Sequence, residues 1–252
     1  MPVSVKILNN NKNEIDNSFD YWNNESIEKN KLFYKLTDDF DKLKNDFKQN
    51  ILSDEIINII KKHKINLKNK NILSIASGVC YVEARTLKDV NFNKLTCIDF
   101  SNHRITKLAP FVFHNFQLEN KNIELISGDF NNYANTKKEN FDLVIMCQAF
   151  HHFSNPKEIL EDVKDLLTPD GSIIIVGEPN HNKFYFFKQI IKNFIKYIIN
   201  YKKFRSYFSI SKIFFGAVLV DTIKGDHHWP IHMYKYFFKR NNTRSFYLKK
   251  NV

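Results

Sequence analysis

Asn71-Ile-Leu-Ser-Ile-Ala-Ser-Gly-Val-Cys-Tyr-Val-Glu83 is the stretch that decides the fold of this chain. Its apolar run from Ile72 to Ile75 predicts a buried strand, and the small residues at 76–78 predict a tight turn. A helix-compatible segment, Tyr81 to Val90, follows directly. Such a junction brings several backbone N–H groups to one point, which suits a ligand that carries a carboxylate or a phosphate. One glycine in a turn is also common in any α/β protein, so the rest of the chain has to decide.

The composition is that of a protein with a substantial core and a basic surface. The chain has 252 residues, and 43% of them are apolar, which is enough for one large α/β domain with additions. The net charge of +11 favours acidic partners, such as phosphorylated metabolites, anionic lipid surfaces or nucleic acid. Abundant Lys, Asn, Ile and Phe also fit an AT-rich genome, so part of this charge can reflect codon usage.

The cysteines and the apolar runs bear on the compartment. Cys80, Cys97 and Cys147 are odd in number and have no CxxC spacing, which predicts a reducing, cytoplasmic environment. The segment from Met1 to Asn13 has no secretory pattern. No uncharged apolar run reaches the roughly 18 residues of a membrane span. We therefore expect a cytoplasmic protein without a spanning helix.

Strand-like and helix-like segments alternate after the opening stretch. Further strands are predicted at Lys94–Asp99, Ile123–Ile126, Phe141–Met146 and Ser172–Val176. This alternation predicts right-handed crossovers and an α/β fold, with a Rossmann-like, mostly parallel sheet flanked by helices. In such a sheet the ligand cleft lies beyond the carboxyl ends of the strands.

Capping and breaking residues set the expected ends of the connecting helices. Ser101 caps a helix that Pro110 breaks or kinks. Asn155 caps a second helix, with Pro156 as its first residue, which runs through Leu167. A turn at 169–171 then leads into the fifth strand.

The N-terminal third is expected to be a helical cap. Residues 1–18 are Asn-rich and predicted to lack regular structure, and Lys31–Phe47 is an amphipathic pattern typical of a helix. Ser53 is the predicted cap of a second helix that runs through Ile60. We assign residues 1–68 to this cap.

The C-terminal third interrupts the strand–helix rhythm. Lys183–Arg205 predicts a basic, aromatic helix, Met233–Lys239 another helix, and Arg244–Lys249 a sixth strand. We therefore divide the remainder into a core at 69–180 and an acceptor-site insertion, with the C-terminal end of the core, at 181–252.

The order of motifs resembles that of class I S-adenosylmethionine-dependent methyltransferases over roughly residues 70–180. An acid, Asp99, ends the second strand, and Gly128-Asp129 follows the third. The fourth strand, Phe141–Ile145, reads Phe-Asp-Leu-Val-Ile and is followed by the matching segment Ala149–Phe153. Leu166–Ile175 is like the family's LxPGG turn and the fifth strand after it.

The first motif departs from that family, in which an acid and a Gly precede a Gly-x-Gly turn. Ser74 stands at the acid position, Ala76 and Cys80 stand at two glycine positions, and Gly78 alone is retained. Cys80 is compatible with the turn if its φ is negative. Ser74 removes the charge that orders the methionine amino end of the cofactor. Glu83, one turn into the helix, is a candidate replacement and equally a candidate surface residue.

The resemblance implies S-adenosylmethionine as the cofactor. Asp99 would accept hydrogen bonds from both ribose hydroxyls. Asp129 would accept one from the adenine amino group, with Phe130 or Phe100 packed on the ring. The whole expected cofactor site consists of Ala76, Ser77, Gly78, Asp99, Phe100, Asp129, Phe130 and Gln148.

The resemblance also implies an acceptor side of the cleft. His152, directly after the fourth strand, is the predicted catalytic contact, paired with Tyr21 from the N-terminal cap, and His151 is expected to matter less. Glu178 and His181 follow the fifth strand at the same rim and are predicted substrate contacts. The function implied is methyl transfer to a small-molecule or glycan-like acceptor in biosynthesis.

A metal site is the alternative role of one histidine-rich loop. Asp226, His227, His228 and His232 are suitable ligands for a divalent ion. Because no second ligand cluster follows at fixed spacing, we expect no metal, and we assign His228 and Trp229 to the acceptor pocket.

Two other functions remain as alternatives. The basic helix at 183–205 would suit a protein that contacts a membrane surface or lipid and carries a degenerate methyltransferase fold, although a lid helix packed on the sheet gives the same pattern. Nucleic acid is not expected as a partner, because the lysines are spread along the chain. The Asn/Asp-Pro-Pro-aromatic signature is also absent after the fourth strand.

Overall fold

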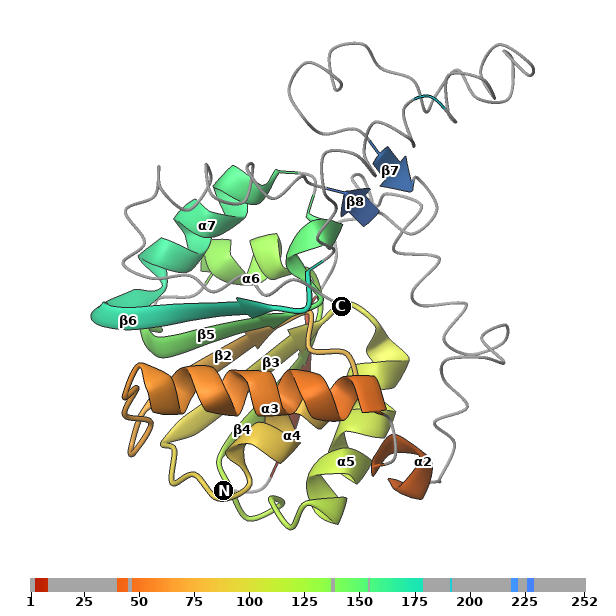
Figure 1. Cartoon of the computed structure of the whole chain (residues 1–252), viewed down its shortest axis with the longest axis vertical. Helices are drawn as coiled ribbons and strands as arrows, with labels where there is room; N and C mark the ends of the chain where they lie inside the picture. Colours follow the sequence, from red (N-terminus) through yellow and green to blue (C-terminus); the bar gives the residue numbers. More distant parts are fainter. Residues whose placement is uncertain are drawn as a thin grey trace.

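Six strands of one parallel sheet form the centre of the protein, and helices cover both of its faces (Figure 1). The computed structural model describes residues 3–8, 40–44, 47–136, 139–153, 155–178, 191, 219–221 and 226–228. The predicted helices at 183–205 and 233–239 and the predicted strand at 244–249 lie outside these residues, apart from Ile191, as do positions 31–39 of the first predicted helix.

The strand order places the opening stretch in the middle of the sheet. The order is β1-β4-β3-β2-β5-β6, and every neighbouring pair is parallel. The strands are β1 (Ser4–Ile7), β2 (Asn71–Ile75), β3 (Lys94–Asp99), β4 (Ile123–Ser127), β5 (Phe141–Cys147) and β6 (Leu167–Val176). The predicted Rossmann-like α/β fold is therefore confirmed. A short antiparallel pair, β7 (Leu219–Asp221) and β8 (Asp226–His228), lies outside this sheet.

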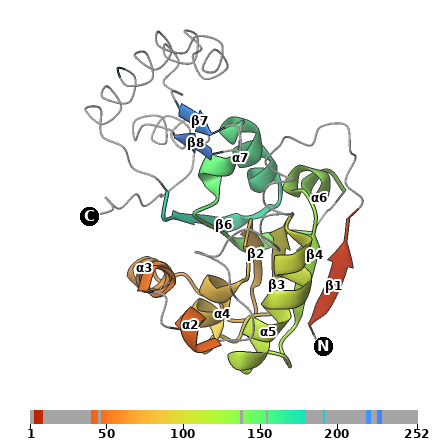
Figure 2. The same ribbon diagram turned by 90° about the vertical axis from the view of Figure 1, so that its right-hand side faces the viewer.

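Alternate residues of the strands pack into two separate hydrophobic cores, because successive side chains point to opposite faces of a sheet. Ile72 packs into one core and Leu73 into the other, and both are fully buried. Figure 2 shows the helices of the first core on one side of the sheet and those of the second on the other. The first group is α2 (Phe40–Lys44), α3 (Phe47–Lys62), α4 (Tyr81–Leu87) and α5 (Ala109–Asn115), and the second is α6 (Phe130–Thr136) and α7 (Pro156–Asp165).

One helix start differs from the prediction, and a second matches it in position but lacks the expected cap bond. Helix α3 begins at Phe47, so Ser53 lies buried inside it rather than capping it. Asn155 does stand at the start of α7, but its side chain makes no cap bond and instead donates a hydrogen bond to Glu158, 2.8 Å away. The α3 error arose because a good cap residue inside an apolar pattern looks like a start.

Two proline-containing segments also differ. Pro110 does not break the helix but stands at the start of α5, directly after a π-helical turn, η2 (Arg104–Leu108), and a kink at this proline stays a prediction. A proline supplies no N–H to the preceding turn, and a wider turn accommodates that loss. The expected turn at 169–171 lies inside β6, at an irregularity of the pairing in which Phe141 is opposite Leu167 but Leu143 is opposite Ser172.

The N-terminal segment corrects the prediction that residues 1–18 lack regular structure. β1 pairs in parallel with β4, with Ser4 opposite Glu124, and so adds an edge strand to the sheet. Its residues are exposed, with Val5 43% and Ile7 67% accessible, so burial cannot hold it in place. The division of the chain at residues 68 and 180 stays a prediction, but residues 4–7 belong to the core sheet.

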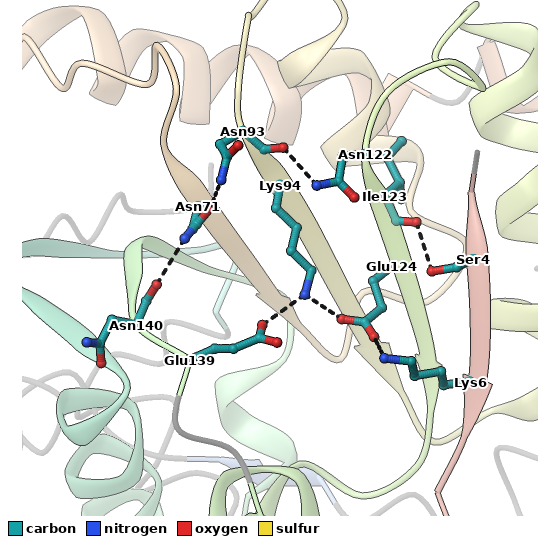
Figure 3. A network of polar contacts seen from close by, with 10 residues as sticks. All are labelled: Ser4, Lys6, Asn71, Asn93, Lys94, Asn122, Ile123, Glu124, Glu139 and Asn140. Carbon is teal, nitrogen blue, oxygen red and sulfur yellow. Dashed lines mark hydrogen bonds and ion pairs between the residues drawn. The ribbon is translucent and has the colours of Figure 1, made fainter. Parts of the chain in front are cut away.

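An ion-pair cluster attaches β1 to the sheet (Figure 3). Glu124, whose side chain is 4% exposed, lies between Lys6 of β1 and Lys94 of β3. Lys94 also pairs with Glu139, with its Nζ 2.8 Å from Glu124 and 2.9 Å from Glu139. The ion pairs lower the pKa of Glu124, although burial acts in the opposite direction.

We predict that Glu124→Gln lowers the free energy of unfolding by about 2 kcal/mol or more, because it leaves two ammonium groups beside a neutral, buried amide. The measurement is urea unfolding. Glu161→Gln is the matched control, since Glu161 pairs with Lys157 on the surface at 3.4 Å. An exposed pair of this kind contributes about 0–1 kcal/mol. Equal losses in the two variants would contradict the prediction.

Candidate functional site

The carboxyl ends of β3, β2 and β5 lie next to one another, because β2 pairs with both of the others. Three groups of residues therefore meet at this edge: the turn after β2, the acid at the end of β3, and the segment after β5. None of the described helices is long and apolar enough to cross a membrane.

The turn after β2 keeps a glycine-type backbone with only one glycine. Ala76, Gly78 and Cys80 all lie in the left-handed region, with φ of 53°, 56° and 59°. The negative φ that would make Cys80 compatible with the turn without strain is therefore not found. The left-handed region costs a non-glycine residue about 1–2 kcal/mol, so Ala76 and Cys80 hold a strained turn. A Cβ built on Gly78 would meet nothing within 4 Å, so this side of the turn is open to a ligand.

We predict that Ala76→Gly raises the free energy of unfolding by about 0.5–1 kcal/mol, because relief of the left-handed strain outweighs the larger entropy of glycine in the unfolded chain. The melting temperature would rise by about 2–4 °C per kcal/mol.

Ala84→Gly is the control for this substitution, since Ala84 lies in helix α4 and is fully buried. There the same change should destabilise the protein by about 1 kcal/mol or more. If Ala76→Gly also destabilised it, the strain would be absent.

Asp99 ends β3 and holds the turn from the side. One oxygen accepts a hydrogen bond from the Gly78 N–H at 2.7 Å, and the other accepts one from the Ser101 N–H at 2.8 Å. Burial raises the pKa of Asp99, although Arg104 and the two N–H groups act in the opposite direction. Two of the roughly four lone-pair positions of its carboxylate remain for other donors.

Glu83 is a buried acid beneath the turn, so the surface position considered from the sequence is wrong. It is 2% exposed, and its Oε1 accepts a hydrogen bond from the Ser74 hydroxyl at 2.6 Å. A carboxylate from α4 thus lies beside the strand position where the sequence has serine. Burial raises the pKa of Glu83 from 4.5 to about 7, and the nearby charge of Asp99 raises it further.

We predict that Glu83 makes the stability depend on pH. Between pH 4.5 and about 7 the folded protein keeps a proton on Glu83 that the unfolded chain releases. The stability that this bound proton gives the folded protein is therefore complete below pH 4.5 and is lost as pH rises through about 7. The rise of the Glu83 pKa from 4.5 to about 7 corresponds to roughly 3 kcal/mol.

The measurement is urea unfolding of the wild-type protein and of Glu83→Gln at about pH 5 and about pH 8. The stability of the wild type relative to the variant should fall by up to roughly 3 kcal/mol over this range. Glu124 and Asp142 titrate in both proteins, so their effects cancel in the difference. A difference that does not change with pH would contradict the prediction.

One carboxylate organises the segment after β5. Glu178, with a 1% exposed side chain, accepts hydrogen bonds from the backbone N–H groups of Ala149 and Phe150 at 3.0 Å and of His151 at 2.9 Å. Its Oε2 also lies 2.8 Å from Nδ1 of the His151 ring. The sequence placed Glu178 at the substrate rim and gave no sign of this contact, because 27 residues separate it from His151. A contact between Glu178 and a substrate stays a prediction.

His152 closes the short 3₁₀ helix η3 (Phe150–His152). Its N–H donates to Ala149 O at 3.0 Å, and its ring lies 4.1 Å from that of His151, centroid to centroid. The charge of His152 is one of the influences that lower the pKa of Asp99. His152 therefore lies within electrostatic reach of the end of β3, and its contact with an acceptor stays a prediction.

The other described candidates lie around the same edge. Gln148 has a φ of 52° and donates its N–H to Val176 O at 2.9 Å. Asp129 caps α6, accepting from the N–H groups of Asn131 and Asn132 at 2.7 and 3.3 Å. Phe130 is 4% exposed and packs edge-on against Phe153 within the core.

The two aromatic residues that were predicted to pack on the adenine ring differ in their exposure. Phe100 is half-buried, so of the pair Phe100 and Phe130 it is the one with an accessible side chain. Ser77 donates its N–H to Ile98 O at 3.1 Å, which ties the turn to β3. The cofactor roles of these residues remain predictions.

The remaining candidates belong to the two ends of the chain. Tyr21, His181 and Trp229 lie outside the described residues. His228 ends β8, whose backbone lies against η3. Among the described residues, no group of three or more His, Cys, Asp or Glu side chains could hold a metal ion.

Residues 73–173 match a protein-family model described as a methyltransferase domain. This segment contains the turn after β2, Asp99 and the segment after β5. A comparison with curated protein sequences finds no match.

Several solved structures resemble the chain. A methyltransferase from Thiobacillus denitrificans, in complex with S-adenosyl-L-homocysteine, is 18% identical, with a TM-score of 0.38 over 47% of this chain and 46% of that one. One from Clostridium acetobutylicum is 20% identical, with a TM-score of 0.40 over 56% and 54%. The YcgJ protein of Bacillus subtilis is 13% identical, with a TM-score of 0.49 over 76% and 68%.

The aligned region spans about half the length of the Thiobacillus protein. With TM-scores below 0.5, these likenesses carry no argument about what the present chain binds or does.

Proposed function

We propose that this chain, whose residues 73–173 match the family model of a methyltransferase domain, belongs to the class I S-adenosylmethionine-dependent superfamily and transfers a methyl group from S-adenosylmethionine to a small-molecule or glycan-like acceptor. The observation that carries the proposal is the turn after β2. Its backbone is left-handed at Ala76, Gly78 and Cys80, and its central N–H is held by Asp99.

The residues of this edge fit the cofactor. The open side of Gly78 admits close approach of a ligand to the backbone. Asp99 keeps lone pairs for the two ribose hydroxyls. Glu83 is a buried carboxylate, and none of the influences on its pKa comes from a cationic side chain of the described residues. It suits the α-ammonium group of the cofactor, the group that the family's strand acid would order.

S-adenosylmethionine, when bound, supplies an electrophilic methyl group on a sulfonium. The task of this chain is to hold that group in line with an acceptor and to exclude water. Because β5 lies beside β2, the segment after β5 is next to the turn that would hold the cofactor. We assign His152 to the acceptor side of this edge.

The acceptor pocket is proposed to involve the residues after β6. The backbone of β8 lies against η3, so a segment about 75 residues beyond η3 in the sequence returns to the site edge (Figure 1). This arrangement supports an acceptor pocket lined by the insertion at 181–252, with Tyr21 contributed by the N-terminal cap. A cavity enclosed by such segments suits a small acceptor.

Calorimetric titration with S-adenosyl-L-homocysteine tests the proposal. We predict that Asp99→Asn weakens binding by about 1.5–3 kcal/mol, about 10- to 150-fold, because the amide turns an N–H₂ group toward a backbone donor and loses the charge.

Asp142→Asn is the matched control. Asp142 holds Lys70 and Asn71 at the opposite end of the sheet, 2.8 and 2.9 Å away, so its loss should leave the affinity unchanged. If the wild-type protein did not bind the ligand, the methyltransferase proposal would be refuted.

A further inference from the structure

We infer that His151, oriented by Glu178, is the group that takes the proton from the acceptor, and that the acceptor is therefore a hydroxyl compound. The inference rests on the proposed function and deepens it. It moves the proton-accepting role from His152, which the sequence favoured, to the neighbouring ring.

The contact between Glu178 and His151 is buried and fully occupied on the carboxylate side. A carboxylate offers about four lone-pair positions. Backbone N–H groups of Ala149, Phe150 and His151 use three of them, and the His151 ring uses the fourth.

This arrangement fixes which ring nitrogen carries the proton. Because the Glu178 oxygens already accept hydrogen bonds from backbone donors, Nδ1 of His151 has to be the donor in the fourth contact, at 2.8 Å. In the neutral imidazole the proton is then on Nδ1 and the lone pair is on Nε2. A base oriented by a third group is the arrangement used in nucleophilic and acid–base catalysis.

The lone pair of Nε2 has access to the outside. The hydrogen bonds of His151 in the described residues involve its N–H and Nδ1. Nε2 of His151 takes part in none of these hydrogen bonds and still is not one of the buried polar atoms, whereas Nδ1 of His152 is buried. The side chain of His151 is 11% exposed, and that exposure leaves room for contact at the free ring nitrogen.

The chemistry explains why a hydroxyl acceptor needs this group. A neutral amine attacks with its own lone pair, but a neutral hydroxyl is a weak nucleophile until it loses its proton. As the O–H bond breaks, its electron pair stays on oxygen, and the proton forms a new bond to Nε2. The resulting imidazolium is paired with the Glu178 carboxylate and later releases the proton to water. Such assistance is worth about 100- to 10,000-fold in rate.

The test is the protonation pattern of the ring, which does not require a known acceptor. Protein labelled with ¹⁵N in histidine would be studied by long-range ¹H–¹⁵N NMR with saturating S-adenosyl-L-homocysteine, and His151→Gln and His152→Gln would assign the signals. We expect His151 to carry its proton on Nδ1. A proton on Nε2 in the neutral His151 ring would overturn the inference.

A variant comparison separates orientation from mere burial. Glu178→Gln should shift His151 toward the Nε2-protonated form, because the amide can no longer serve as a pure acceptor. Glu158→Gln, the same change on the exposed side of α7, should leave the ring unaltered. An unchanged ring in a folded Glu178→Gln protein would count against the role of Glu178.

A pair of small probes tests the hydroxyl class. Phenol and anisole have similar rings, but only phenol can donate a hydrogen bond. We expect phenol, at millimolar concentration, to shift the Nε2 signal of His151 more than anisole does. Equal shifts would overturn the assignment to hydroxyl acceptors. Absence of S-adenosyl-L-homocysteine binding by calorimetry would instead refute the proposed function, so the two failures are distinguishable.

Discussion

The parallel pairing of β2 with both β3 and β5 is the constraint on which the rest of the structure depends. It brings to one edge the turn at 76–80, the acid at the end of β3 and the segment that carries His151 and His152. Each of these pieces is unremarkable by itself. Their register, with Ile75 opposite both Ile98 and Met146, is what makes them neighbours.

Three buried carboxylates stabilise this edge, and each is satisfied differently. Asp99 is held by backbone N–H groups from two loops, Glu83 by the Ser74 hydroxyl and its own backbone N–H, and Glu178 by three N–H groups and an imidazole. A buried carboxylate is costly unless hydrogen bonds compensate for lost hydration. Glu83 is the least compensated of the three, which agrees with its raised pKa and leaves it the most responsive to a nearby cation.

The sheet could be predicted from the sequence because its central strands are apolar runs that end in small or acidic residues. Five strands and their parallel arrangement follow from that pattern alone. β1 could not, since a four-residue edge strand with exposed side chains has no hydrophobic signature. Its position depends on Lys6 finding Glu124, which lies 118 positions further along the chain.

The site was only partly predictable for the same kind of reason. Ala76, Gly78 and Asp99 could be located from motif spacing, but the left-handed φ of Cys80 is a tertiary property that the sequence does not state. The pairing of Glu178 with His151 likewise links two loops from different strands. Motif order locates residues along the chain, and only the fold determines which of two adjacent histidines meets a carboxylate.

The direction of β1 determines at which edge of the sheet the chain enters and leaves the domain. Because β1 runs parallel to the other strands, Ser4 lies at the amino edge of the sheet, and Leu8, bonded to Ser127 O at 2.8 Å, leaves from the carboxyl edge. The chain therefore enters the domain on the side remote from the candidate site and emerges on the side where that site lies. A probe attached ahead of Ser4 would report on the sheet without obstructing the ligand, whereas one inserted just after Leu8 would start at the rim of the site.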